Sequence, residues 1–253
     1  MSDEPTLRQA VLDDPDAEAP RVDYAAWCDQ QPDVATQARG EFIRLQIGLE
    51  KYTPGGTSRG DQRLRMFELS DRFANTWAQP LAPWVSKREF HRGFVEYVTL
   101  SAANFLAHAK DLFALAPIRH VDLTDVRNVN ESLFASPWLA TLRSLGMDAV
   151  GLHDIHMQLL GASPHAAQLG WLSAEDNHLT TNSYAALAAS TTLPRLRFAR
   201  FSGNTVDPVE QLGMDGEEVV AVHMPDEGVA LEQQHGHLEW LHRDGKSESR
   251  FAY

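Results

Sequence analysis

Two pairs of histidines and a single cysteine are the residues of this chain whose types could support chemistry. His153 and His156 lie three positions apart, and His235 and His237 flank one glycine. Imidazole nitrogens bind Zn²⁺, but neither pair has a third or fourth ligand at a useful spacing. Cys28 has acidic neighbours, which raise the pKa of a thiol and oppose nucleophilic catalysis. We therefore expect solvated histidines, an inert thiol, no bound metal and no cofactor.

A second set of residues combines rings and carboxylates at equivalent positions of five short segments. The set comprises Tyr97, His120, Asp122, Asp148, Trp171, Glu175, Phe198 and Arg200. Side chains alternate along a strand, so these residues would share the concave face of a sheet. Exposed aromatics beside acids are typical of protein-binding hot spots for a basic partner. The alternative is that the rings only pack along the sheet or against a cap.

These equivalent positions follow from an L-x-x-L-x-L pattern that occurs five times, which aligns the residues in rows across the segments. The segments begin at Val95, Ile118, Leu142, Leu169 and Leu196, at intervals of 23, 24, 27 and 27 residues. This spacing falls within the range of leucine-rich repeats. In the last two segments Asn177 and Asn204 occupy the position of a buried amide that bonds the backbone of the next turn. The pattern predicts an α/β fold, a solenoid whose curved parallel sheet has about five degenerate repeats.

The segments between these strands show helical spacing of apolar residues, and proline falls near their ends. Helices are expected at residues 104–116, 129–139, 156–160 and 182–189. A unit of one strand and one helix cannot bury its apolar side alone, so both ends of the stack need caps. Residues 93–212 are therefore assigned to the repeats.

The two ends of the chain have patterns of their own. Residues 1–92 are predicted to form a helical N-terminal cap, with helices at 6–12, 21–30, 35–51 and 62–77. Residues 213–253 contain short alternating segments at Val219–Met224, Gly228–Gln233 and His237–Leu241. These segments predict a small antiparallel β-sheet that covers the last repeat as a C-terminal cap.

The N-terminal stretch resembles the bacterial repeat-companion domain, a helical module found ahead of degenerate leucine-rich repeats. The resemblance rests on Asp13-Asp14-Pro15-Asp16, on Tyr24-Ala25-Ala26-Trp27 and on Arg39-Gly40-Glu41-Phe42-Ile43-Arg44-Leu45-Gln46. With the repeats it covers roughly residues 5–210. Cys28, where the family has an apolar residue, and an insertion at 34–37 depart from the pattern. The resemblance implies an architecture and supplies no catalytic residue set.

Composition and charge limit the classes of partner. The 253 residues carry a formal net charge of −13, whereas nucleic acids and anionic membranes select basic surfaces. The sequence has no apolar run of about 20 residues, as a membrane span would need. We therefore expect a cytoplasmic, monomeric and non-catalytic module that binds a basic protein, without nucleic acid or membrane. An immunity or inhibitor protein that occludes a basic toxin or nuclease is the alternative.

Overall fold

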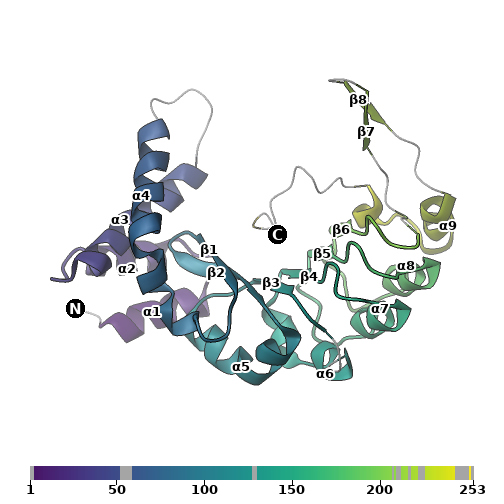
Figure 1. Ribbon diagram of the computed structural model, residues 1–253, viewed down its shortest axis with the longest axis horizontal. Helices are drawn as coiled ribbons and strands as arrows, with labels where there is room; N and C mark the ends of the chain where they lie inside the picture. Colours follow the sequence, from purple (N-terminus) through teal and green to yellow (C-terminus); the bar gives the residue numbers. More distant parts are fainter. Residues whose placement is uncertain are drawn as a thin grey trace. The chain divides into compact units, whose positions relative to one another are not determined.

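The computed structural model describes residues 3–51, 59–126, 130–206, 208, 212–215, 218–221, 226–242 and 251. They form a mixed α/β fold with a six-stranded sheet of order β1-β2-β3-β4-β5-β6 (Figure 1). The chain divides into two compact units. The first contains Met1–Val98 and Lys110–Ile118, and the second contains Thr99–Ala109 and Arg119–Tyr253.

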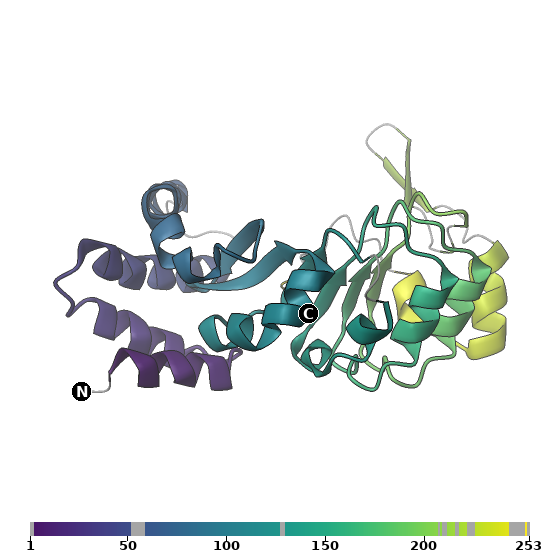
Figure 2. The same cartoon turned by 60° about the horizontal axis from the view of Figure 1, so that its bottom comes forward.

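Four α-helices dominate the first unit, as the sequence predicts. They are α1 (Glu4–Asp13), α2 (Ala19–Cys28), α3 (Val34–Glu50) and α4 (Arg59–Trp77), and the 3-10 helix η1 (Gln79–Leu81) follows. Asp3 accepts from the Thr6 amide at 3.1 Å and Asp33 accepts from the Thr36 amide at 2.8 Å, so both side chains cap free N–H groups. Figure 2 shows α1, α2 and α3 side by side.

The strands β1 (Lys87–His91) and β2 (Phe94–Leu100) complete this unit, apart from the last residues of β2. Arg92 and Gly93 connect them with φ values of 46° and 86°, a conformation that favours glycine. A Cβ atom at Gly93 would lie 2.0 Å from Ile43 Cγ1. Glycine therefore lets the turn approach α3 closely, next to the cluster of Val11, Tyr24, Ala25, Cys28, Ile43, Ile47 and Phe94 that forms a core.

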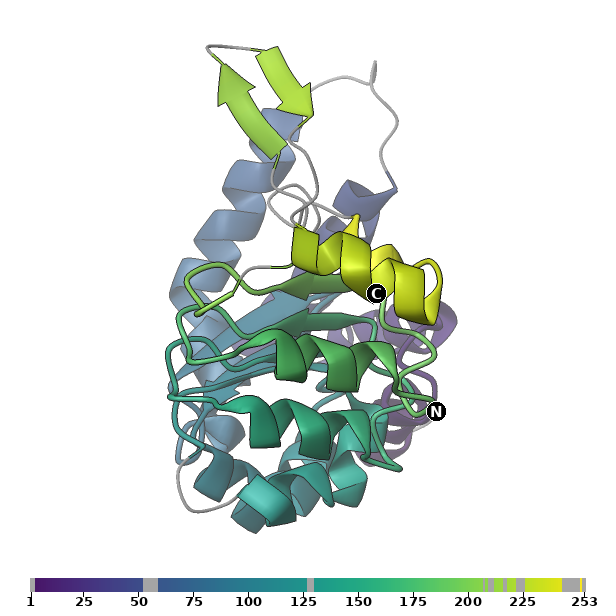
Figure 3. The same ribbon diagram turned by 90° about the vertical axis from the view of Figure 1, so that its right-hand side faces the viewer.

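Parallel strands and intervening helices build the second unit. The strands are β3 (His120–Leu123), β4 (Ser144–Gly146), β5 (Trp171–Ser173) and β6 (Phe198–Arg200). The helical segments are α5 (Ala102–Leu115), which contributes to both units, α6 (Asn130–Phe134), η2 (Pro137–Thr141), α7 (Asp154–Gly161) and α8 (Thr181–Ala188). In Figure 3, α7 and α8 lie in successive layers with α9 (Asp226–His235) beyond them.

The apolar positions of the L-x-x-L-x-L segments from Ile118 onward are buried, as predicted. These core residues are Ile118, Val121, Leu123, Leu142, Leu145, Met147, Leu169, Leu172, Ala174, Leu196, Ala199 and Phe201. The helix predicted at 129–139 is instead the short α6 and the 3-10 helix η2, because Pro137 lacks the amide hydrogen that a continuous helix would use. Val129 lies outside the described residues.

The C-terminal region is only partly the antiparallel sheet that the sequence predicts. β7 (Leu212–Asp215) and β8 (Glu218–Ala221) pair antiparallel, while 222–224 lie outside the described residues. The predicted strand Gly228–Gln233 is wrong, since it lies within α9, and the 3-10 helix η3 (Glu239–Leu241) replaces the predicted strand at 237–241. In α9 the buried residues are Gly228 and Leu231, three positions apart, which is helical rather than strand spacing.

Candidate protein-binding face

The register of β3–β6 aligns the residues that the sequence placed in rows. His120 pairs with Ser144, Ser144 with Trp171, and Trp171 with Phe198. In the next row Asp122, Gly146, Ser173 and Arg200 are neighbours in the same way. The predicted register of these four segments is therefore confirmed, and it places neighbouring members of a row about 4.8 Å apart.

The row that contains the aromatic rings is buried, contrary to the expectation of an exposed aromatic surface. His120, Trp171 and Phe198 are 2%, 3% and 0% exposed. Trp171 stacks on Phe198 with ring centroids 5.6 Å apart, and Phe251 meets the His120 ring edge-on at 4.8 Å. The expectation is wrong because neighbouring rings and a residue far along the chain cover this row.

Tyr97 is also buried, within the first unit. It was predicted in the same row as His120, but it lies in β2 among residues that are buried along the whole strand. Its neighbour Glu96 is buried as well and pairs with Arg21 of α2 at 2.6 Å. The sequence gives no local sign of this ion pair, because its two residues lie 75 positions apart in the chain. Tyr97 thus has no exposed ring to offer a partner.

Carboxylates, not rings, are the groups that reach solvent in β3 and just after β4 and β5. Asp148 is exposed, Asp122 and Glu175 are half-buried, and Asp176 beside Glu175 is exposed. We call these four residues the acidic edge. All four belong to the second unit; Asp122 lies in β3, and the other three follow the neighbouring strands β4 and β5 of the same sheet. Of the predicted site residues, those that reach solvent are therefore Asp122, Asp148, Glu175 and Arg200.

Hydrogen bonds fix the geometry of the acidic edge. Asp148 Oδ1 accepts from the Ser173 hydroxyl at 2.6 Å and from the Glu175 amide at 2.9 Å. Glu175 forms an ion pair with Arg200. Asp122 lies over Gly146, where a Cβ atom would come within 2.1 Å of Asp122 Oδ1. These contacts fix the positions of the Asp148 and Glu175 carboxylates.

The electrostatic setting of Glu175 reflects its mixed surroundings. Burial raises the pKa of Glu175, the Arg200 guanidinium opposes that rise, and the nearby Asp148 carboxylate adds to it. Burial is therefore the main cause of the raised pKa of Glu175, and the negative charge of Asp148 is a smaller one.

Two asparagines hold the turns that carry these acids. Asn177 Oδ1 accepts from the amides of Val150 and Leu152 at 3.1 and 2.9 Å. Its Nδ2 donates to the carbonyls of Met147 and Glu175 at 2.9 and 2.8 Å. Asn177 is buried, as predicted.

Asn204 makes equivalent backbone bonds one segment later. It accepts from the Leu179 amide at 3.1 Å and donates to the carbonyls of Ala174 and Phe201 at 2.8 and 2.7 Å. Its predicted bonding is confirmed, although its side chain is half-buried rather than buried.

The histidine pairs and the cysteine have different outcomes. The expectation of solvated histidines is wrong for His156, which is buried because its Nδ1 accepts from the His153 amide at 2.8 Å and the pair caps the start of α7. Cys28 is fully buried, and burial raises its pKa to about 12, which agrees with an inert thiol. His237, in contrast, lies near two potential ligands that the sequence analysis did not connect with it, Glu232 and His242.

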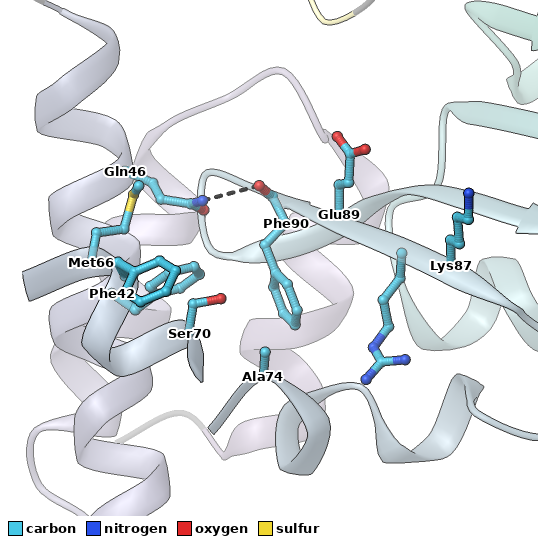
Figure 4. A pocket seen from close by; sticks show the side chains of 10 residues that line it. Phe42, Gln46, Met66, Ser70, Ala74, Lys87, Glu89 and Phe90 are labelled. Atoms are coloured by element: carbon cyan, nitrogen blue, oxygen red, sulfur yellow. Dashed lines mark hydrogen bonds between the residues drawn. The ribbon is translucent and has the colours of Figure 1, made fainter. Parts of the chain in front are cut away.

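A surface hollow of about 660 Å³ in the first unit is a feature that the sequence analysis did not predict. Figure 4 shows Phe42 and Phe90 in its wall, with Gln46 donating to the Phe90 carbonyl at 3.0 Å. Lys87 of β1 also lines it, and Phe67 at its edge is 66% exposed. Its lining is therefore largely apolar, unlike the acidic edge of the second unit.

Comparisons with known proteins leave the site to be judged on its geometry. Compared with protein-family models, with curated proteins and with solved structures, the chain has no significant match. Within the described part of the chain, no helix combines the length and the apolar character that crossing a bilayer requires.

Proposed function

We propose that this chain is a non-catalytic protein-interaction module, built as a degenerate leucine-rich-repeat solenoid, that binds a partner with a basic surface. The single observation that carries the proposal is the acidic edge, where Asp122 lies in β3 and Asp148, Glu175 and Asp176 follow the adjacent parallel strands β4 and β5. Lysine and arginine side chains of a partner would pair with these carboxylates.

Two further properties support binding through this edge. The net charge of −13 would steer a basic partner toward the chain before contact. Asp148 is already bonded to Ser173 and to the Glu175 backbone, so little conformational freedom would be lost on binding. Trp171 and Phe198, which are buried, support the sheet under this edge rather than anchoring a partner.

The test compares two variants that remove equal charge. The edge variant carries Asp148→Asn, Glu175→Gln and Asp176→Asn. The control variant carries Asp13→Asn, Asp23→Asn and Asp71→Asn, three exposed acids in the first unit. Each protein is used as bait for capture from the native cytoplasm, and captured proteins are purified for calorimetry at two salt concentrations.

We expect to capture a basic protein that binds to the parent chain and to the control variant but not to the edge variant. Its affinity should fall at the higher salt concentration, because exposed charge pairs are screened. Equal binding by the edge and control variants would overturn the assignment of the face.

The measured affinity also separates a scaffold from an inhibitor. The strong negative charge of the chain favours the second candidate, an immunity or inhibitor protein for a basic toxin or nuclease. An inhibitor must occlude its target at low concentration, so its Kd should be about 1 nM or lower, whereas a scaffold typically binds in the micromolar range. Inhibition of the captured protein's activity would decide for the inhibitor.

A further inference from the structure

Three side chains near the C-terminal end of α9 bring two imidazoles and a carboxylate together. Glu232 Oε1 lies 2.8 Å from His242 Nε2 and 3.0 Å from His237 Nδ1. The two histidine rings stack with centroids 4.7 Å apart, and all three ligand atoms lie within 4.8 Å of one another. The sequence analysis considered His237 only with His235 and therefore found no further ligand.

The backbone holds these three side chains in place. Glu232 lies in the last turns of α9, and Gly236 leaves the helix with φ +83°, which turns the chain back toward Glu232. The Leu238 amide donates to Glu232 Oε1 at 2.7 Å, while the Gly236 amide donates to the Glu232 carbonyl at 2.9 Å. Trp240, which lies between the two histidines in the chain, is buried in η3. The cluster is therefore built into a fixed helix end.

The contacts of the Glu232 carboxylate favour the binding of a cation. A carboxylate oxygen has about two lone-pair sites, yet Oε1 faces three nitrogen atoms, those of Leu238, His237 and His242. A metal ion between the carboxylate and the two imidazoles would replace two of these crowded contacts. Each neutral imidazole has one nitrogen lone pair to give to the ion.

We propose that Glu232, His237 and His242 bind a divalent transition-metal ion of the Zn²⁺ type. Two nitrogen ligands and one oxygen ligand suit Zn²⁺, whereas Ca²⁺ and Mg²⁺ prefer oxygen ligands alone. Ligand atoms of a tetrahedral Zn²⁺ site are roughly 3.3 Å apart, so the two distances from Glu232 Oε1 to the histidine nitrogens need to open by only a few tenths of an ångström. The two histidine nitrogens, which lie within 4.8 Å of each other, can adjust by rotation of the exposed His237 side chain. The ion would tie α9 to the segment that follows it.

The fourth coordination position would face solvent. The His237 side chain is 70% exposed, so water or a ligand from another molecule could complete the coordination. An exposed site of this kind exchanges its metal with the medium, so the bound ion is accessible to chelators. This inference stands apart from the proposed protein-binding role of the acidic edge.

The test measures Zn²⁺ binding to the full chain by calorimetry after treatment with a chelator, together with the melting temperature with and without ZnCl₂. His237→Asn is the main variant, because its exposed side chain can be removed without disturbing the core. Glu232→Gln is the second variant, and circular dichroism checks that both are folded. The matched control is His178→Asn, since His178 and His153 have ring centroids 5.0 Å apart and could attract Zn²⁺ by themselves.

The expected result is one Zn²⁺ ion per chain and a rise in melting temperature that a chelator reverses. His237→Asn and Glu232→Gln should weaken binding at least about tenfold, while His178→Asn should bind like the parent. Cobalt substitution should give the intense visible absorption of tetrahedral coordination. The proposal is overturned if the parent binds no Zn²⁺, if the two cluster variants bind it equally well, or if only His178→Asn loses it.

Discussion

Arg21 and Glu96 form an ion pair at 2.6 Å in which the side chains are 0% and 2% exposed. The Arg21 guanidinium also donates to the carbonyl groups of Pro15, His91 and Arg92 at 2.8, 3.2 and 3.1 Å. One buried cation thus connects the segment before α2 with the β1–β2 turn and with β2. Without Glu96, the guanidinium would keep its carbonyl partners but lose its counter-charge.

Glu96→Leu should lower the free energy of unfolding by about 3–5 kcal/mol, because it leaves an uncompensated charge in the interior. Arg21→Met should also destabilise the chain, but by less, because Glu96 keeps the Arg92 guanidinium at 3.8 Å and the His91 ring at 3.2 Å. The double variant Arg21→Met, Glu96→Leu should recover much of the loss, since apolar side chains can replace a buried ion pair. Urea unfolding of the four proteins gives the coupling energy. A coupling energy near zero would contradict a direct role for the pair.

Asn177→Ala should destabilise the chain more than Asn204→Ala does. The first change removes the partner of the buried backbone groups of Leu152 and Met147 and of the half-buried amide of Val150, at a cost of about 3 kcal/mol. Asn204 is half-buried, so water can replace part of its bonding, and we expect about 1 kcal/mol. Chemical unfolding at equal protein concentration makes the comparison. Equal losses would show that burial does not control the contribution of these amides.

Gly146→Ala should destabilise the sheet through a clash with Asp122. The new Cβ would meet Asp122 Oδ1 at 2.1 Å, and overpacking of this kind costs about 1–3 kcal/mol. In a background of Asp122→Ala, the same glycine substitution should cost much less, because the obstructing carboxylate is gone. A double-mutant cycle by thermal unfolding measures the difference. If Gly146→Ala costs the same in both backgrounds, the loss comes from the backbone and not from Asp122.

The apolar spacing of the sequence was sufficient to predict the strands β3–β6, their register and most helices. Leu145, Leu172 and their equivalents are buried because each strand needs one face in the core, and this requirement is visible as local periodicity. Asn177 was predictable for a similar reason, since a polar residue at a fixed offset from a buried strand has the turn backbone as its partner.

The solvent exposure of the other face of the sheet could not be predicted in the same way. Whether His120 meets water depends on Phe251, which lies 131 positions along the chain from it. The Glu232 and His242 partners of His237 likewise come together only because 228–233 is helical and Gly236 reverses the chain, whereas the alternating pattern had indicated a strand. Two things therefore limit what can be predicted from the sequence. One is contact between segments that are distant in the chain, and the other is the choice between strand and helix spacing for a short segment.

Asp154 should make stability depend on pH in the acid range. Burial alone would raise the pKa of Asp154, but donation from Ser183 and from the Thr180 hydroxyl and amide lowers it below the ordinary value of 3.8. A lowered folded-state pKa gives stability that is present above the unfolded-state pKa and is lost as pH falls through the folded-state value. Asp154→Asn should therefore be less stable than the parent at pH 7, and the gap should close below about pH 4. Unfolding curves from pH 7 to pH 3 test this, and a gap that stays constant would contradict it.

Cys28 should be unreactive in the folded chain and should couple stability to pH in the alkaline range. Burial raises its pKa to about 12, against the opposing effect of the Arg39 charge, while nearby Asp29 adds to the rise. A folded-state pKa above the unfolded-state value gives stability that is present below the latter and is lost as pH rises toward the former. The parent should therefore lose stability more steeply than Cys28→Ala between about pH 9 and pH 11. Tyr24, whose pKa burial also raises to about 12, is common to both proteins and cancels in the comparison.

Labelling of Cys28 with a thiol reagent at pH 8 gives an independent measurement, in which the labelling rate should follow the unfolding equilibrium as urea is added. Rapid labelling of one thiol per chain in the absence of urea would show that Cys28 is accessible in the native state and that its burial between α2 and α3 is wrong.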